Sequence, residues 1–462
     1  MPRYVTSLVN QRGMSPAPST QAPVALSETN TSIGFPATFA PSDIVSACSP
    51  GRTGPSGAPL PGRVRVGGRV LEVAEGAVVL GDAFSALRVA LEGALAPPLE
   101  VGDLAIVEGA PAPAGRALAS ARLVERIAPR RPPRARAGAA APPSSETERA
   151  IHRGRGAALA QRAAALGAVR ALFAERGFLE VETPSMVPSP GLDLHLDAFA
   201  VQAARPTFLI TSPEYQMKRL LSGGVPRCFQ LARCFRRGEL GDRHNPEFTM
   251  LEWYRAFAGV DEVMADTEAI VRRVAGALGA EGTISTSGKQ VRLERPFPRI
   301  SIGEAFARWA GVPADDAIAL ASSDEERFFR LLVDAVEPAI AALPHPVFLV
   351  DFPAPFASLA RLKPSDPRVC ERFELYVAGV ELCNGFGELT DPVEQRARLL
   401  ADQAARAAQG KPVYPIDERF LDALEEGMPP AAGNALGVDR LVALCLGAPS
   451  IGDVLAFPHG WL

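Results

Sequence analysis

The chain has 462 residues, of which 47% are hydrophobic, and a formal charge of −4 at pH 7. A chain of this length and composition can bury a full core, and it predicts more than one domain. The acidic balance argues against a protein that coats nucleic acid, although it allows a local basic patch. No apolar run of about 18 residues and no signal-peptide core is evident, so we expect a soluble, cytoplasmic protein without a membrane partner.

Six cysteines lie at scattered positions from Cys48 to Cys445, and none forms a CxxC pair. This spacing predicts reduced thiols and excludes both a disulfide framework and a typical zinc site.

Composition divides the chain into four segments. Residues 1–60 are rich in Ser, Thr, Pro, Ala and Gly and are expected to be disordered. Residues 62–128 contain short alternating runs such as RVRVGGRVLEV and LRVAL, which predict a small OB-like β-barrel with Phe84 as its one aromatic residue. Residues 129–148 form a basic, Pro-rich linker, and residues 150–462 are interpreted as one catalytic domain.

The catalytic domain is predicted to begin with a helix over residues 159–176. Its apolar positions include Val169 and Phe173, and Gly177 is placed to cap it. The segment FLEVETP, which ends at Pro184, follows as a predicted strand.

A hairpin is predicted between Cys228 and Tyr254, with a charged loop between its strands. Alternation places Phe248 and Glu252 on one face of the second strand and Leu251 on the other. The guanidinium of Arg236 can bind a phosphate, His244 can reach outer phosphates, and Phe248 can stack on a base. An ordinary hairpin with a solvated, charged tip remains the alternative.

The segment FELYVAGVELCNGFGELTD predicts a second hairpin. If Ala378-Gly379 forms its turn, Tyr376 pairs with Glu381 and Glu374 pairs with Cys383. Glu374 and Glu381 then become diagonal neighbours that can hold one hard cation. A solvent-facing pair of acids is the alternative.

The segment NALGVDRLVALCLG predicts a strand followed by a helix. Arg440 falls in the first turn of that helix, where the positive helix end also favours phosphate. A salt bridge on the helix surface is the alternative.

These segments together resemble the class II aminoacyl-tRNA synthetases, and HNPEFTMLEWY resembles the second signature motif of their lysyl branch. The resemblance implies an α+β catalytic domain in which helices flank an antiparallel sheet, with ATP and Mg²⁺ as cofactors. The helix and strand that end at Pro184 resemble the first motif, which lies at the dimer interface of the family and implies a homodimer. One departure is Gly238, which replaces the acid expected two residues after Arg236 and precedes Glu239.

The resemblance also implies roles for individual residues, with Arg236 and Arg440 catalytic and Glu374 and Glu381 holding the metal. The implied ATP-binding residues are Arg236, Arg237, Gly238, His244, Asn245, Phe248, Glu381, Leu382, Gly437 and Arg440. The implied substrate-binding residues are Ser212, Pro213, Glu214, Glu252, Tyr254, Cys383, Asn384 and Glu388. Three acids in the second group favour a substrate with two amines.

Within this branch, TSPEYQMKRLL, HNPEFTMLEWY and ELCNGFGELTD most resemble the family of elongation factor P (R)-β-lysine ligases. Lysyl-tRNA synthetases have Gly at the position of Cys383, whereas the ligases typically have Ala. A side chain there would reduce the space beside the amine-bearing carbon, and the amine in the β position could relieve the clash. A small buried thiol that packs as a hydrophobic residue is the alternative. The implied activity is ATP-dependent activation of (R)-β-lysine as an adenylate and its transfer to a lysine of elongation factor P.

Two alternatives remain at this point. A lysyl-tRNA synthetase would need a barrel that stacks anticodon bases on aromatic side chains. With Phe84 alone the barrel is poorly equipped, so tRNA is not the expected acceptor. A non-catalytic paralogue that senses an amino acid or binds a partner is less consistent with the presence of Arg236, Glu374, Glu381 and Arg440.

Overall fold

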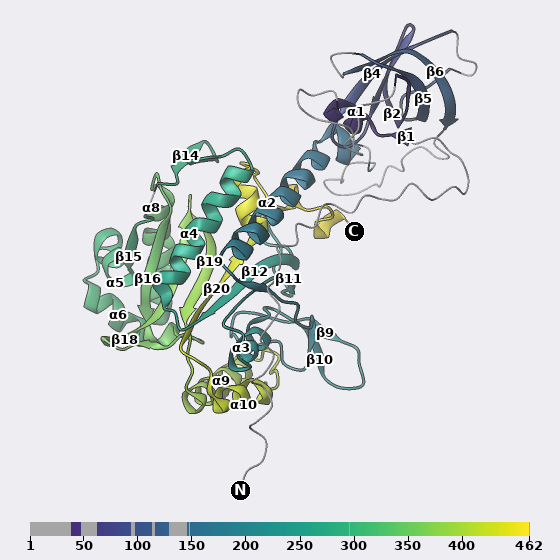
Figure 1. The fold of residues 1–462 in the computed structure, drawn as a ribbon. Helices are drawn as coiled ribbons and strands as arrows, with labels where there is room; N and C mark the ends of the chain where they lie inside the picture. The colour runs from purple at the N-terminus through teal and green to yellow at the C-terminus, as the bar shows by residue number, and fades with distance from the viewer. Residues whose placement is uncertain are drawn as a thin grey trace, which may run out of the picture. The chain divides into compact units, whose positions relative to one another are not determined.

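The computed structural model describes residues 38–47, 62–93, 98–112, 116–128, 146, 148–294 and 296–461. Two compact units, Met1–Pro129 and Arg130–Leu462, divide the chain (Figure 1).

The N-terminal unit contains a β-barrel, as predicted. β2 pairs with both β3 and β5, so the sheet closes on itself, and the inward side chains of alternating residues form its core. Its strands are β1 (Thr38–Phe39), β2 (Val64–Ala74), β3 (Ala77–Gly81), β4 (Ala86–Leu91), β5 (Leu104–Pro111) and β6 (Ala117–Ile127).

The expectation of disorder before the barrel was wrong for residues 38–47. β1 adds to the edge of β2, and helix α1 (Pro41–Ala47) places Ile44 in the barrel core with no exposed surface. The side chain of Asp82 accepts a hydrogen bond from the backbone N–H of Ser42 (2.8 Å). The other residues of 1–60, and all of the linker 129–148 except residues 146 and 148, lie outside the described residues.

The second unit is built on a nine-stranded sheet that is antiparallel apart from the outer pairs β15–β16 and β7–β11. Helices flank this sheet, so the predicted α+β architecture is confirmed (Figure 1). Its strands, in spatial order, are β15 (Arg299–Ser301), β16 (Val347–Pro353), β18 (Asp366–Val377), β19 (Val380–Gly387), β20 (Ala431–Gly437), β12 (Glu247–Ala256), β11 (Arg227–Phe235) and β7 (Leu179–Glu180), with β17 (Leu362–Lys363) beside β18.

Two smaller sheets complete the strands of this unit. They consist of β8 (Met186–Val187), β10 (Thr207–Leu209) and β9 (Ala200–Val201), and of β13 (Thr283–Thr286) with β14 (Lys289–Arg292). The α-helices are α2 (Arg155–Glu175), α3 (Glu214–Ser222), α4 (Val260–Ala277), α5 (Ile302–Ala305), α6 (Ala314–Ser323), α7 (Glu325–Leu331), α8 (Glu337–Ala341), α9 (Pro392–Ala408), α10 (Glu418–Gly427) and α11 (Val438–Cys445).

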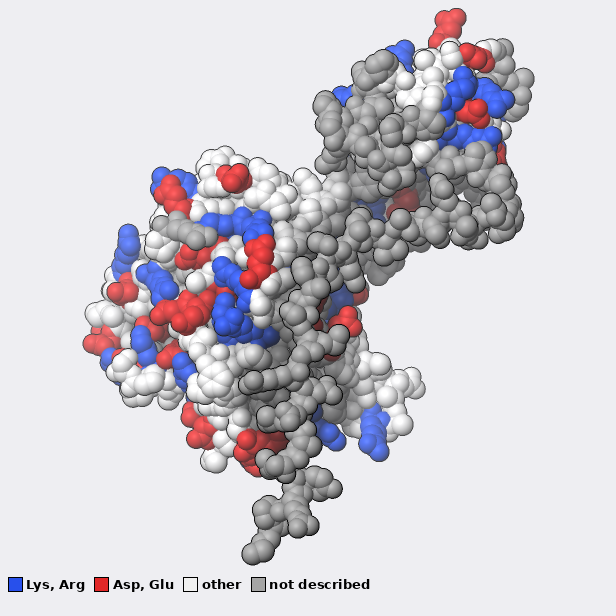
Figure 2. All heavy atoms as spheres, viewed as in Figure 1, with Lys and Arg blue, Asp and Glu red and all other residues white. Residues whose placement is uncertain are grey.

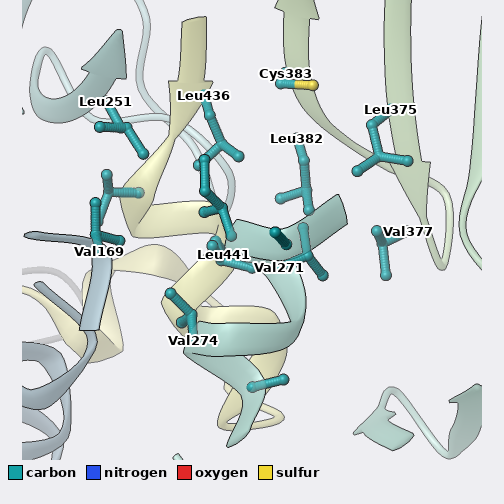
Figure 3. Close-up of a cluster of buried hydrophobic side chains, with 14 of the residues drawn as sticks. Val169, Leu251, Val271, Val274, Leu375, Val377, Leu382, Cys383, Leu436 and Leu441 are labelled. Carbon is teal, nitrogen blue, oxygen red and sulfur yellow. The ribbon is translucent and has the colours of Figure 1, made fainter. Parts of the chain in front are cut away.

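The main hydrophobic core lies between one face of the large sheet and helices α2, α4 and α11. Leu251 and Trp253 of β12 and Leu436 of β20 point into it, and Figure 3 shows neighbouring side chains of the same cluster. Burying such large apolar side chains is the main stabilising contribution. The alternation predicted for β12 is therefore confirmed.

Helix α2 matches the predicted helix, although it begins four residues earlier, and Gly177 has the left-handed φ of +71° that a helix C-terminus favours. The strand predicted after it is shorter, because β7 pairs with β11 over two residues. By length and composition, α2 is the one described helix apolar enough to cross a membrane. Its residues Val169 and Phe173 are buried in the main core, although only 28% of its apolar window is buried.

The surface of the second unit carries both signs of charge. In the view of Figure 2, basic and acidic side chains alternate over this unit, in keeping with the small net charge of the chain. This distribution favours discrete charged sites over one extended basic surface.

The separate cores predict that the second unit folds without the first. The indole N–H of Trp461 donates to the side chain of Glu146 (3.0 Å), and the guanidinium of buried Arg149 lies 4.3 Å from the Trp461 ring. A chain that begins at Glu146 lacks the barrel but keeps the contacts of Glu146 and Arg149 with Trp461. In calorimetry it should lose the unfolding transition of the barrel, and the midpoint of the remaining transition should not change. A chain that begins at residue 151 should be less stable by about 1–3 kcal/mol, because it lacks the Arg149 contacts. One shared transition in the full chain would contradict the separation.

Candidate functional site

A cavity of about 420 Å³ opens on the sheet face opposite the main core. Its wall comes from strands β12, β18, β19 and β20, from helices α3 and α11, and from the loop between β11 and β12. Of the residues expected from the sequence, those that line it are Ser212, Glu214, Arg236, His244, Asn245, Phe248, Glu374, Glu381, Leu382, Cys383, Asn384, Gly437 and Arg440.

One cross-strand row runs beneath the cavity. Glu252, Ala435, Asn384 and Glu374 are paired in register from β12 through β20 and β19 to β18. Neighbouring strands lie about 4.8 Å apart, so the backbones of Glu252 and Glu374 are separated by about 14 Å. The row joins two acidic regions at a distance that fits an extended small molecule.

At one end of the cavity, the cationic groups of Arg236 and Arg440 lie near His244. Arg440 Nη2 is 2.7 Å from His244 Nε2, and Arg440 Nη1 donates to the backbone oxygen of Glu381 (2.8 Å). Burial and the neighbouring Arg440 lower the pKa of His244, so its ring is neutral at pH 7. The Arg236 guanidinium carbon lies 5.0 Å from the Phe248 ring centroid, and the buried Nε of Arg236 has no hydrogen-bond partner among the residues that the structure describes. This end suits an anion with a flat group beside it.

The hairpin of β18 and β19 corrects one predicted pairing. Its turn at Ala378-Gly379 and the pairing of Tyr376 with Glu381 are as expected, but Glu374 pairs with Asn384 and not with Cys383. The cause is an irregularity between the pairs Leu375–Cys383 and Tyr376–Glu381, where β19 carries one extra residue, Leu382.

The corrected pairing leaves Glu374 and Glu381 on the cavity wall. Arg372 Nη2 donates to Glu374 Oε1 (2.7 Å), and the Tyr376 hydroxyl donates to Glu374 Oε2 (2.9 Å). These contacts fix the orientation of the Glu374 carboxylate. Two carboxylates on one wall are suitable oxygen ligands for Mg²⁺ when phosphate oxygens complete its shell. Within the described residues, no cluster of three or more His, Cys, Asp or Glu side chains could hold a metal alone.

Cys383 lies on the core side of the sheet and not on the row of Glu374. It pairs with Leu375 and Leu436 and belongs to the hydrophobic cluster of Figure 3. The prediction that it faces Glu374 was wrong, because the extra residue Leu382 reverses the alternation of β19. Cys383 still borders the cavity, so its effect on substrate choice stays a prediction.

The other end of the cavity rests on an acidic layer formed by Glu214, Glu252 and Glu388. Glu252 is 1% exposed, and its carboxylate accepts hydrogen bonds from the hydroxyls of Ser212 and Tyr254, both 2.6 Å. Burial, and then the neighbouring Glu214, raises the pKa of Glu252 to about 8. Glu252 lies one contact behind the lining residue Ser212, whereas Tyr254 and Glu388 lie two contacts behind the lining, through Glu252 and through Lys218.

Lys218 of α3 enters this layer from behind. Its Nζ donates to Glu214 Oε1 (2.5 Å) and lies 2.6 Å from Glu388 Oε2, in an ion pair that lacks hydrogen-bond angles. Burial raises the pKa of Glu388 to about 7, an effect that Lys218 opposes. Burial acts to lower the pKa of Lys218, but its two ion pairs outweigh that effect and raise the pKa, so the ammonium stays charged. The layer therefore offers carboxylates for amine groups in a water-poor environment.

Six expected site residues do not line the cavity, of which Glu252, Tyr254 and Glu388 belong to the layer behind it. The other three are Pro213, Arg237 and Gly238. Pro213 precedes the first turn of α3, and Arg237 lies 3.6 Å from Asp197 with half of its side chain exposed. Gly238 has a φ of +87°, which favours glycine, and the following Glu239 lines the cavity 3.7 Å from Arg236. An acid therefore lines the cavity one residue after Gly238.

Sequence reasoning missed several charged residues of the cavity and its layer. Arg372 lies two residues before Glu374 on β18, and Asp439 lies beside Arg440, so alternation and helix spacing could have indicated both. Lys218 lies one helical turn after Glu214, which predicts a surface ion pair as readily as a buried one. Asp193 and Asp402 reach the cavity from segments without a recognisable motif.

Comparison with known proteins assigns the second unit to a family. The family of class II tRNA synthetases (D, K and N) matches residues 151–460. Proteins named "elongation factor P–(R)-β-lysine ligase" from Klebsiella pneumoniae subsp. pneumoniae, Salmonella paratyphi B and Salmonella heidelberg are each 44% identical to this chain over 308 residues. That match covers 65% of this chain and 94% of each relative.

The barrel lies outside the residues that the family match covers, whereas every expected site residue lies within them. The chain therefore belongs to the class II tRNA synthetase family and, within it, to the family of elongation factor P–(R)-β-lysine ligases.

Proposed function

We propose that this protein activates (R)-β-lysine with ATP and transfers it to a lysine side chain of elongation factor P. The observation that carries the proposal is one cavity with two arginines at one end, where Arg236 Nε has no hydrogen-bond partner among the described residues, and three carboxylates at the other. A substrate with a carboxylate and two ammonium groups matches both ends. The names of the relatives supply the identity of the substrate and of the acceptor.

In the first step, the substrate carboxylate attacks the α-phosphorus of ATP, and the bond to pyrophosphate breaks. The carboxylate is already ionised at pH 7, so the step needs no general base. Arg236 stabilises the charge that develops on the α-phosphate, while His244 and Arg440 hold the outer phosphates. Phe248 stacks on the adenine. Catalysis then comes from positioning and from charge stabilisation.

Mg²⁺ supplies charge neutralisation for the phosphates when it is bound, and Glu374 and Glu381 are the residues that would hold it. Asn384 lies between this wall and the acidic layer, and its buried Oδ1 has no hydrogen-bond partner in the described part of the chain. Its carbonyl can therefore accept a hydrogen bond from a substrate ammonium group.

In the second step, the amine of the acceptor lysine attacks the activated carbonyl, and AMP leaves. The acceptor amine must lose its proton before or during this attack. The dimer expected from the first motif is part of the proposal, and sedimentation analysis tests it. Transfer to tRNA is the alternative outcome, and Phe84, the one aromatic residue of the barrel sequence, offers only a single position for base stacking.

The test of the function combines ATP–pyrophosphate exchange with acceptor transfer. Exchange should require ATP, Mg²⁺ and a diamino acid, with (R)-β-lysine preferred over lysine. The labelled product should then appear on elongation factor P, detected by mass spectrometry, and not on tRNA. Transfer to tRNA in preference to elongation factor P would replace the proposal with a tRNA synthetase, and the absence of exchange with either substrate would reject both.

Replacing Arg236 or Arg440 with Ala should reduce exchange by about 10²–10³-fold, because each change removes a charge-assisted contact to phosphate. Arg396→Ala is the matched control, since Arg396 pairs with Glu418 (2.7 Å) on the exposed surface and lies outside the cavity lining. Equal melting temperatures would show that folding is intact. Exchange at the wild-type rate in both cavity variants would remove the phosphate assignment.

Binding of (R)-β-lysine should strengthen as the pH rises from 7 to 8. Glu252 has a raised pKa of about 8, so in the empty cavity it holds a proton at pH 7. A bound ammonium favours the ionised carboxylate, so binding releases that proton and the affinity gains up to about tenfold per pH unit below the pKa. Calorimetry in buffers of different ionisation enthalpy measures both the number of protons released and the affinity. Glu252→Gln should weaken binding and remove the slope between pH 7 and 8; a slope that persists in this variant belongs to another group.

A further inference from the structure

The buried lysine of the acidic layer has no role in the chemistry described above. Lys218 has no exposed surface, and its Nζ lies between Glu214 and Glu388 and 6.0 Å from the Phe420 ring. A methionine at this position would fill a similar space beside the ring without the cost of burying an ammonium group. Buried ion pairs often add little net stability compared with apolar replacements, so stability alone does not explain this lysine.

The charges of the layer can be counted from its contacts. With a cationic substrate bound, Glu214, Glu252 and Glu388 are ionised and contribute three negative charges, and Lys218 contributes one positive charge. Arg361 also faces Glu388, but its guanidinium is paired with Glu371 (2.5 Å). Ser212 and Tyr254, which contact Glu252, are neutral hydroxyl donors. Counted over these contacts, without Asp193 and Asp402 elsewhere on the cavity wall, the layer has a net charge of −2, which balances the charge of two ammonium groups.

We propose that Lys218 is a specificity-determining positioning residue, which sets the net charge of the acidic layer to match a diamino substrate and holds Glu214 and Glu388 in place. The inference rests on the proposed function and deepens it. A buried site that is short of one charge, or has one in excess, binds its ligand poorly or takes up a proton. Lys218 makes two buried ammonium groups the balanced ligand, so a substrate with one amine leaves a buried carboxylate unpaired.

The sharpest test removes a carboxylate from the layer and then removes the ammonium group of Lys218 as well. The second substitution should restore the binding that the first one weakens. Glu388→Gln leaves Glu214, Glu252 and Lys218, so the net charge becomes −1, and the KM for (R)-β-lysine should rise by about 30-fold or more. Adding Lys218→Met returns the net charge to −2. The double variant should recover at least about tenfold of that loss in KM, with a smaller change in kcat, measured by ATP–pyrophosphate exchange.

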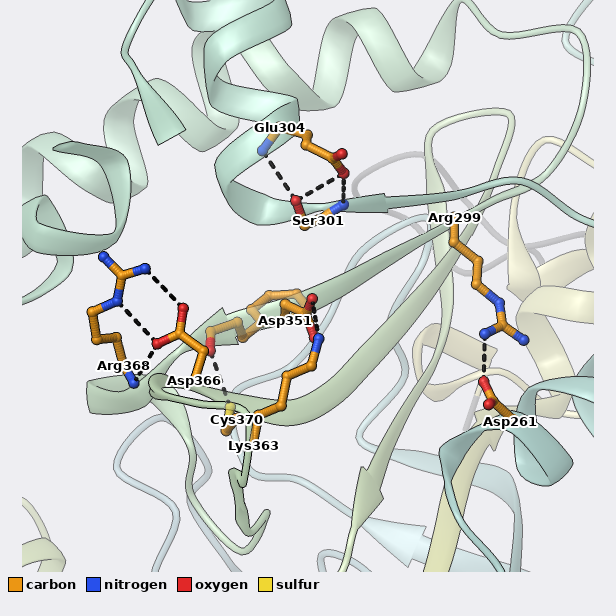
Figure 4. A network of polar contacts seen from close by, with 10 residues as sticks. Asp261, Arg299, Ser301, Glu304, Asp351, Lys363, Asp366, Arg368 and Cys370 are labelled. Carbon is orange, nitrogen blue, oxygen red and sulfur yellow. Dashed lines mark hydrogen bonds and ion pairs between the residues drawn. The ribbon is translucent and has the colours of Figure 1, made fainter. Parts of the chain in front are cut away.

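The matched control is another lysine–carboxylate pair of the same unit. Lys363 Nζ lies 2.7 Å from Asp351 Oδ2, outside the cavity lining, as Figure 4 shows. Asp351→Asn, alone or with Lys363→Met, should leave the KM for (R)-β-lysine unchanged. Melting temperatures of all variants separate loss of folding from loss of binding.

Lys218→Met alone supplies an independent measurement. It leaves Glu388 without its ion pair, so the pKa of Glu388 should rise further and its protonated form should weaken substrate binding at pH 7. The ratio of the variant KM to the wild-type KM should then fall as the pH rises from 7 to 9. A structural lysine would give a ratio that does not change with pH.

The outcomes separate the inference from the function. Lack of exchange by the wild-type protein with (R)-β-lysine and with lysine would reject the proposed function. If the wild-type protein catalyses exchange but the double variant has a KM no lower than that of Glu388→Gln, the proposed role of Lys218 is overturned and the proposed function stands. Glu388 would then be assigned a direct contact with a substrate amine. If Glu388→Gln does not fold, the ratio of the Lys218→Met KM to the wild-type KM supplies the test. A ratio that falls as the pH rises supports the role of Lys218, and a ratio that does not change with pH overturns it.

Discussion

Side-chain alternation across four adjacent strands separates the hydrophobic core from the charged cavity, and the remaining contacts of the site depend on this separation. Leu251 and Leu436 face the helices, while Glu252 and Ala435, one residue away on the same strands, lie on the row beneath the cavity. The core therefore anchors each charged residue through its neighbour in sequence. A site supported in this way can keep its side chains oriented without a ligand, which lowers the reorganisation required for binding.

Burial of charge is the second constraint, and the two ends of the cavity meet it differently. At the acidic end, Lys218 and two hydroxyl groups contact the carboxylates but leave a net negative charge for the ligand to balance. At the cationic end, Arg236 Nε has no hydrogen-bond partner among the described residues. A buried donor without an acceptor is costly, and a phosphate oxygen is a strong acceptor. Ligand charge therefore completes the electrostatics of both ends.

Much of the fold could be predicted from the sequence, because the relevant patterns are local. Alternating residues indicated the barrel and the faces of β12, and Gly177 indicated the end of α2. The cross-strand position of Cys383 could not be predicted, since a single extra residue in β19 alters the pairing without changing the local pattern. The ordered helix α1 was missed because one buried residue, Ile44, stabilises it against a distant segment. The contact of Lys218 with Glu388 was missed for the same reason, since 170 residues separate the two in sequence.

The irregular pairing at Leu382 also limits how this hairpin can evolve. β19 is paired with β18 on one side and with β20 on the other, so it cannot shift without breaking both pairings. The extra residue Leu382 sets which of its side chains face the core and which face the cavity. Loss of Leu382 would turn Asn384 toward the core and Cys383 toward the ligand in one step, or would force the strand to slide. Substitutions that keep its length disturb one side chain at a time. We therefore expect evolutionary drift in this hairpin to act on residue identity, while insertions and deletions are confined to its turn at Ala378-Gly379.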